Sequence, residues 1–178
     1  MKLVILDRDG VINQDSERYI KSPAEWQPIP GAIEAIARLH QGGFRIVVAT
    51  NQSGIGRGLF DMATFNAMND KMMEMVFRQG GRIDALFFCP HTDTENCACR
   101  KPRTGLLTEY LRANPPDPQH SYVIGDRDTD LQLAANLGLQ GLRVRADGAD
   151  GATWPAVVER LARLAPDHLA HDLQHEFG

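Results

Sequence analysis

Two carboxylates near the start of the chain could do chemistry together. Asp7 and Asp9 follow the mostly aliphatic stretch Lys2–Leu6, and Gly10, which tolerates a sharp turn, comes directly after them. Residues two apart in an extended backbone point the same way, so we expect the two carboxyl groups to lie close together. Such a pair can bind a metal ion or act as nucleophile and general acid, although a turn or a helix cap uses the same residues.

A cluster of cysteines and one histidine is the most specific pattern in the chain. Cys89, His91, Cys97 and Cys99 form the spacing C-x-H-x5-C-x-C. Four sulfur and nitrogen donors this close together suit a closed, tetrahedral Zn²⁺ site that holds a loop without its own core. The alternative is a set of unligated thiols beside a surface histidine. We expect zinc in a structural role, because a closed site leaves no position for water or substrate.

A basic run follows the last cysteine. Arg100 and Lys101 are the first residues of the run Arg-Lys-Pro-Arg. Such runs are usually solvated surface charge. A zinc site next to the run would instead fix its backbone and direct the two side chains.

Polar residues also follow two other predicted strands. Thr50 ends the strand 45–50, and the glycine-containing loop 51–58 comes next, where backbone N–H groups could bind an anion or simply begin a helix. Asp126 follows the strand 121–124 and Gly125, as Asp7 follows the first strand. Residues 128–130 could be no more than helix caps.

Alternating strands and helices predict an α/β fold, a doubly wound parallel sheet with right-handed crossovers. The carboxyl ends of parallel strands meet at one edge, so Asp7, Thr50 and Asp126 should converge there. Oxygen ligands of this kind suit Mg²⁺, and Lys101 could add positive charge for phosphoryl transfer. We expect further strands at 86–89 and 139–144, and helices from Pro30, over 65–76, from Thr104–Gly105, over 131–137 and over 154–164.

Composition indicates an ordinary globular protein. The chain has 178 residues, 43% hydrophobic and 24% charged, which favours a single domain over 1–178. A net charge of −4 argues against nucleic acid as a partner, and no apolar run approaches the roughly 20 residues of a membrane span. We expect a cytoplasmic monomer without membrane contact, with Trp26 and Trp154 packed inside and the tail 166–178, which contains His168, His171 and His175, exposed.

Four segments taken together resemble the haloacid dehalogenase superfamily of phosphatases. They are LDRDGVIN, ATNQSG, RKP and IGDRDTD, in this order, and the resemblance covers Lys2 to Leu142. It implies a Rossmann-like sheet. The zinc segment 89–99 is similar to the branch that contains heptose bisphosphate and histidinol-phosphate phosphatases, which lacks a separate cap domain.

The resemblance also implies roles for individual residues. Asp7 would attack phosphorus to form an aspartyl phosphate, and Asp9 would serve as general acid and then as general base. Mg²⁺ would be held by Asp7, the Asp9 backbone carbonyl and Asp126, while Thr50 and Lys101 would stabilise the transferring group. The residues implied in substrate binding are Asp15, Arg18, Tyr19, Asn51, Gln52, Ser53, Arg100 and Arg127.

Short sequence segments give some indication of the substrate. TNQSGIGRG and DRDGVIN resemble the heptose enzymes more closely, and this resemblance implies a phosphorylated sugar, heptose 1,7-bisphosphate, which would lose its 7-phosphate on the way to lipopolysaccharide. GDRDTD instead leans toward histidinol phosphate, the alternative substrate. A hypothesis of another class is a zinc-knuckle module that binds nucleic acid through 89–101; the acidic net charge counts against it.

Overall fold

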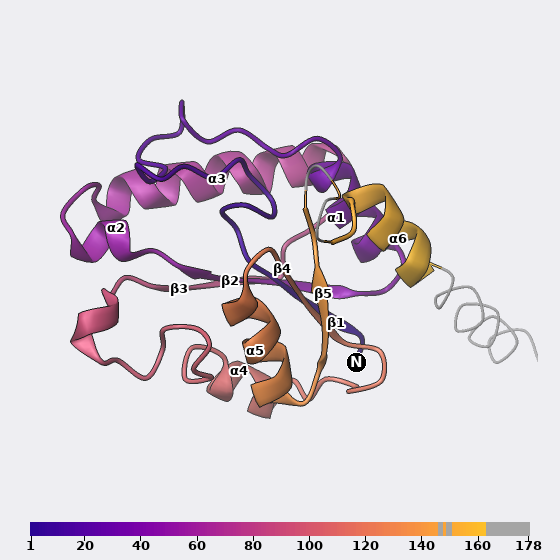
Figure 1. The fold of residues 1–178 in the computed structure, drawn as a ribbon. Coiled ribbons are helices and arrows are strands. Elements are labelled where there is room, and N and C mark those ends of the chain that lie inside the picture. The colour runs from indigo at the N-terminus through magenta and orange to yellow at the C-terminus, as the bar shows by residue number, and fades with distance from the viewer. Residues whose placement is uncertain (146–147, 149–150, 163–178) are drawn as a thin grey trace, which may run out of the picture.

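The computed structural model describes residues 1–145, 148 and 151–162, and its centre is a parallel five-stranded sheet (Figure 1). The strands are β1 (Leu3–Leu6), β2 (Arg45–Asn51), β3 (Ala85–Cys89), β4 (Tyr122–Gly125) and β5 (Gln140–Arg143). Their order is β3-β2-β1-β4-β5, and every neighbouring pair is parallel. The predicted α/β fold is confirmed, with β1 in the middle of the sheet.

Helices cover both faces of the sheet. They are α1 (Ala32–Gln41), α2 (Ser53–Gly56), α3 (Met62–Arg78), α4 (Thr108–Ala113), α5 (Asp128–Leu137) and α6 (Trp154–Ala162), with a short 3₁₀ turn η1 (Asp93–Glu95). Figure 1 shows α1, α3 and α6 on one face and α4 and α5 on the other. None of these described helices is long and apolar enough to cross a membrane.

The central strand separates two apolar layers. All four residues of β1 are buried. Val4 and Leu6 belong to the layer under α1, α3 and α6, whereas Leu3 and Ile5 face the layer under α4 and α5. Alternate residues of a strand point to opposite faces, so a strand covered on both sides is apolar throughout.

Both tryptophans are buried, as expected. Trp26 is fully buried and Trp154 nearly so. The indole N–H of Trp154 donates to the carbonyl of Val11 at 2.8 Å. This bond ties α6 to the loop that follows the first strand end.

Several predicted boundaries differ from the structure. The helix expected from 104–105 begins at Thr108, because Gly105 instead donates its N–H to the Ala98 carbonyl at 3.1 Å and packs on the cysteine-containing loop. The last strand is shorter than the predicted 139–144, and α6 is described only to Ala162. The tail with the three histidines lies outside the described residues.

Local backbone geometry brings the strand ends together. The N–H of Asp7 donates to the carbonyl of Ile124 at 3.2 Å, which carries the pairing of β1 with β4 one residue beyond β1. Gly10 has φ +85°, and a Cβ at this position would overlap the carboxylate of Asp126. The glycine therefore serves both the turn and the close approach of a second carboxylate.

Candidate active site

A buried lysine lies between two carboxylates at the carboxyl edge of the sheet. Lys101 Nζ is 3.2 Å from Asp7 Oδ1 and 2.8 Å from Asp130 Oδ1. Burial on its own lowers the pKa of Lys101, but the charges of Asp7 and Asp130 outweigh it and raise this pKa overall. The lysine therefore stays protonated next to Asp7.

Burial raises the pKa of Asp7 to about 7, even though Lys101 acts in the opposite direction. Repulsion from Asp130, Asp9 and Asp126 adds to the increase. The pKa of Asp126 is also raised, by burial first and then by Asp130. The site thus has more negative charge than Lys101 offsets, which is the condition under which a cation binds.

The carboxylates fit a divalent cation. Asp7, Asp126 and Asp130 each have a carboxylate oxygen within 4.8 Å of the others. Asp130 is already engaged by Lys101 and by the backbone N–H of Arg127 at 3.4 Å. Asp126 Oδ1, in contrast, is buried without a hydrogen-bond partner in the described part of the chain. Asp7 is engaged only through Oδ1, by the N–H of Arg8 at 2.8 Å and by Lys101 at 3.2 Å, whereas both oxygens of Asp130 are engaged. Among the described residues, Asp7 and Asp126 are therefore the pair with oxygens left for a hard cation such as Mg²⁺.

The carboxylate of Asp9 is held by donors from three directions. Oδ1 accepts from Arg8 Nε at 2.9 Å and from Asn13 Nδ2 at 3.1 Å. Oδ2 accepts from Gln52 Nε2 at 3.1 Å, and the same amide donates to Thr50 Oγ1 at 2.9 Å. Gln52, which we expected to contact substrate, thus also joins two of the predicted catalytic residues.

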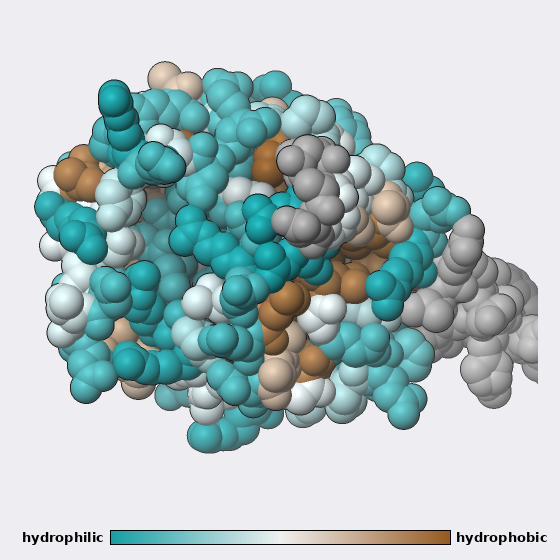
Figure 2. Space-filling model, viewed as in Figure 1, coloured by the Kyte–Doolittle hydropathy of each residue, from teal (hydrophilic) through white to brown (hydrophobic). Residues whose placement is uncertain are grey.

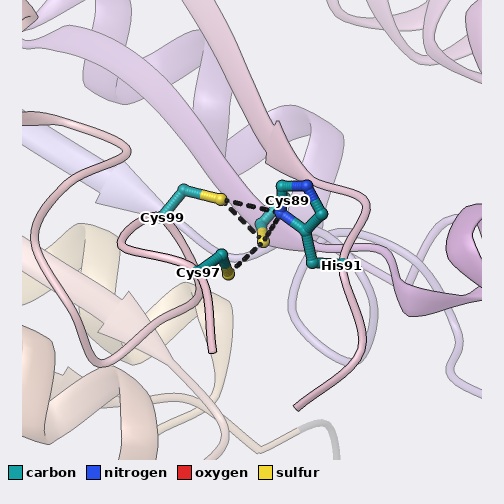
Figure 3. Close-up of side chains that lie close together, drawn as sticks. All are labelled: Cys89, His91, Cys97 and Cys99. Carbon is teal, nitrogen blue, oxygen red and sulfur yellow. Dashed lines mark hydrogen bonds between the residues drawn. The ribbon is translucent and has the colours of Figure 1, made fainter. Parts of the chain in front are cut away.

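The four predicted zinc ligands converge at the end of β3. Figure 3 shows the three sulfur atoms and the imidazole turned toward one another. Cys89 Sγ lies 2.9 Å from Cys99 Sγ and 3.5 Å from Cys97 Sγ, while His91 Nδ1 lies 3.3 Å from Cys99 Sγ. This set of three thiols and one imidazole nitrogen matches the donors of a closed Zn²⁺ site.

The cysteine-containing loop is connected directly to Lys101. Arg100 donates to the carbonyl of His91 at 3.3 Å. The side-chain amide of Asn51 accepts from the N–H of Lys101 at 3.0 Å and donates to its carbonyl at 3.3 Å. The end of β2 and the cysteine-containing loop together fix the backbone from which Lys101 projects.

A cavity of about 780 Å³ opens over these residues. Figure 2 shows that the surface on this side of the molecule is largely hydrophilic. Arg18 is exposed and Thr50 is buried, and neither of them lines the cavity. The predicted site residues that line the cavity are Asp7, Asp9, Asp15, Tyr19, Asn51, Gln52, Ser53, Arg100, Lys101 and Arg127.

Sequence reasoning missed several residues of this site. Arg57 and Arg103 line the cavity, and Asp130 pairs with the lysine. The sequence suggests only a helix cap for Asp130, and its carboxylate does accept from the Arg127 backbone N–H near the start of α5. Its second role depends on a lysine 29 residues away, which no local pattern reveals.

Strand-end carboxylates around a buried lysine, on a sheet of this order, define a phosphatase of the haloacid dehalogenase (HAD) class. Family models agree with this assignment. The HAD-hydrolase-like model matches residues 98–175, and the polynucleotide kinase 3 phosphatase model matches residues 2–127.

Similarity to individual proteins shows which family of HAD phosphatases contains this chain. The chain is 51% identical over 138 residues to the D-glycero-beta-D-manno-heptose-1,7-bisphosphate 7-phosphatase of Bordetella bronchiseptica, covering 78% of this chain and 77% of the relative. It belongs to the family of these 7-phosphatases. The interpretation as a zinc-knuckle module therefore gives way to that of an enzyme.

Solved structures agree with the family assignment. The crystal structure of D,D-heptose 1,7-bisphosphate phosphatase from B. bronchiseptica, complexed with magnesium and phosphate, is 45% identical; the match covers 93% of this chain and all of that one, with a TM-score of 0.84. The histidine biosynthesis bifunctional protein HisB of Campylobacter jejuni is more distant, at 38% identity over 80% of this chain and 41% of its own length.

Proposed function

We propose that this protein is a Mg²⁺-dependent phosphatase that removes the 7-phosphate of D-glycero-D-manno-heptose 1,7-bisphosphate and leaves the sugar 1-phosphate. The observation that supports this proposal best is that Asp7, Lys101 and a group of arginines line the same cavity. A bisphosphate needs two anion sites in one cavity. The proposed reaction is a step toward the activated heptose of lipopolysaccharide.

The charges on the cavity wall favour a second phosphate. Arg127 pairs with Asp15 at 2.9 Å, and Arg57 lies 3.8 Å from Asp93. Arg100 lines the same cavity and has no carboxylate partner among the described residues. A guanidinium without a counter-charge binds phosphate well. Histidinol phosphate carries an amine where the sugar carries its second phosphate, and Arg100 disfavours that cation.

The residues supply each chemical step. An Asp7 carboxylate oxygen attacks phosphorus, the bond from phosphorus to the sugar oxygen breaks, and Asp9 protonates that oxygen. Asp9 then takes a proton from a water molecule, whose oxygen displaces Asp7 and releases inorganic phosphate. The Lys101 ammonium offsets charge on the phosphoryl oxygens, with Thr50 beside it. Asp7, Asp126 and the Asp9 carbonyl would hold Mg²⁺, which supplies further positive charge.

The remaining features complete the proposal. We infer a structural Zn²⁺ held by Cys89, His91, Cys97 and Cys99, on the strength of the donor cluster. We also propose that 1–178 acts as one domain, as a monomer, in the cytoplasm. Light scattering of the purified protein tests the monomer.

Phosphate release with Mg²⁺ from heptose 1,7-bisphosphate, heptose 7-phosphate and histidinol phosphate tests the function. The bisphosphate should have the highest kcat/KM. Arg100→Ala should lower kcat/KM for the bisphosphate by about 10-fold to 100-fold, the value of a hydrogen bond to a charged group, and change heptose 7-phosphate little. Arg78→Ala, an exposed arginine paired with Glu74 on α3, is the matched control. Faster turnover of histidinol phosphate would overturn the proposal.

A further inference from the structure

Arg8 stands between the two catalytic carboxylates in sequence but is fully buried. Its side chain lies over the ring of Phe65, with 5.3 Å from the guanidinium carbon to the ring centroid. Nε donates to Asp9 Oδ1 at 2.9 Å, and Nη1 donates to Asn69 Oδ1 at 3.0 Å. The guanidinium therefore bridges Asp9 and helix α3.

Burying an arginine costs several kcal/mol unless its charge and its donors are satisfied. Here a carboxylate accepts from Nε, an amide oxygen accepts from Nη1 and an aromatic face lies against the group, while Nη2 is buried without a hydrogen-bond partner among the described residues. The guanidinium is planar and rigid, so a bond at Nη1 also sets the direction of the N–H at Nε. Whatever anchors the outer end of Arg8 thereby orients Asp9.

Asn69 is that anchor. It is only 7% exposed and lies on the same buried face of α3 as Phe65, Met68 and Met72. A polar group on such a face is unfavourable unless it is hydrogen-bonded, and Asn69 Oδ1 accepts from Arg8 across 61 positions of sequence. Packing alone would be better served by an apolar side chain at this position.

We propose that Arg8 and Asn69 are positioning residues that hold the Asp9 carboxyl in the orientation needed for proton transfer to the leaving group. The inference rests on the proposed role of Asp9 as general acid and base. Gln52 restrains Oδ2 from the cavity side, while Arg8 and Asn69 restrain Oδ1 from the core side. Helix α3, which contributes no residue to the cavity wall, thus acts on catalysis through one buried amide.

The alternative is that Arg8 and Asn69 only join α3 to the loop after β1 and have no effect on Asp9. The dependence of the cleavage rate on the leaving group distinguishes the positioning role from this structural role. A sugar alkoxide needs a proton from Asp9 to leave, whereas p-nitrophenolate leaves without one. Misplacing Asp9 should therefore slow cleavage of the sugar phosphate selectively. A loss of stability would lower the rates with both substrates in the same proportion.

The experiment measures release of heptose 1-phosphate or p-nitrophenol in a single turnover, with enzyme in excess and Mg²⁺ present. This first step precedes hydrolysis of the aspartyl phosphate, which both substrates share. Asn69→Ala should slow cleavage of the sugar bisphosphate about tenfold or more, which is part of the roughly 10²-fold to 10⁴-fold that general acid catalysis contributes, and cleavage of p-nitrophenyl phosphate less than about threefold. Asn69→Asp keeps an acceptor for Arg8 and should restore most of the rate.

Met72→Ala is the matched control, because it removes buried packing from α3 without removing a polar group. It should slow both substrates equally. Asn69→Ser, which is too short to reach Arg8, is measured in the same way if Asn69→Ala does not fold. Equal losses on the two substrates in the Asn69 variants would overturn the inference.

The variant Asp9→Asn shows whether a negative result contradicts only the positioning role of Arg8 and Asn69 or also the proposed acid role of Asp9. If Asp9→Asn discriminates between the substrates and the Asn69 variants do not, only the positioning role is wrong. If Asp9→Asn itself shows no discrimination, the acid role of Asp9 is wrong and the inference fails with it.

Discussion

Lys101 Nζ lies 3.2 Å from Asp7 Oδ1, and both groups sit at the carboxyl edge of the sheet with little access to solvent. This pairing sets a cation against the proposed nucleophile before any metal binds. It also explains why a lysine is tolerated in the interior, since Asp130 provides a second carboxylate at 2.8 Å.

Replacing Lys101 with methionine should lower kcat about 10²-fold to 10³-fold, the cost of removing one preorganised charge from a transition state. Lys101→Arg, which keeps the charge on a different shape, should recover part of the rate. Steady-state kinetics with saturating Mg²⁺ measures both. A fall of less than about threefold in folded Lys101→Met would contradict the role we assign to this residue.

The raised pKa of Asp7 predicts a pH-dependent stability in protein without Mg²⁺. The pKa of Asp7 is 3.8 in the unfolded chain and about 7 in the folded chain. Between pH 3.8 and about pH 7, the folded chain therefore keeps a proton on Asp7 that the unfolded chain has released. The stability contributed by Asp7 is therefore greatest below about pH 4 and is lost as pH rises toward 7.

Mg²⁺ should act in the opposite sense, because it favours the ionised carboxylate. The increase in Tm that Mg²⁺ produces should be larger at about pH 8 than at about pH 5. Thermal unfolding with and without Mg²⁺ at both values measures this difference. Asp7→Asn is the control and should remove most of the pH dependence; an equal Mg²⁺ effect at both pH values in the unaltered chain would argue against the metal site.

Gly10→Ala should weaken Mg²⁺ binding beyond its effect on stability. The left-handed backbone at φ +85° costs a non-glycine residue about 1–2 kcal/mol, and the added methyl group would also displace the Asp126 carboxylate. Gly138→Ala is the matched control, since its φ is +70° and a Cβ there meets nothing within 4 Å. Both variants should lose stability, Gly10→Ala more than Gly138→Ala because of the overlap with Asp126, and only Gly10→Ala should require more Mg²⁺ for half-maximal activity.

The fold and the strand-end carboxylates were accessible from sequence because they depend on local patterns. A short aliphatic strand followed by an aspartate predicts the positions of Asp7 and Asp126 at one edge. The roles of Asp130 and Asn69 were not accessible, because each depends on a cation far away in the sequence. The predicted start of α4 is too early because Gly105 packs against Ala98, a tertiary contact that a local sequence pattern does not reveal.

The cluster of Cys89, His91, Cys97 and Cys99, with the zinc we propose there, should control the position of Lys101 rather than take part in the reaction. Cys97→Ser should remove about one equivalent of metal per chain, as expected for loss of one of four ligands, and should lower kcat by weakening the backbone constraint on Arg100 and Lys101. Elemental analysis of the purified protein and steady-state kinetics measure the two effects. Thr94→Ala, an exposed change in the same loop, should alter neither. Because Asn51 also binds the Lys101 backbone through two hydrogen bonds, part of the activity should survive loss of the metal. Unaltered protein that contains no zinc would refute the structural metal. Full activity in metal-free Cys97→Ser would instead mean that Asn51 alone constrains the Lys101 backbone.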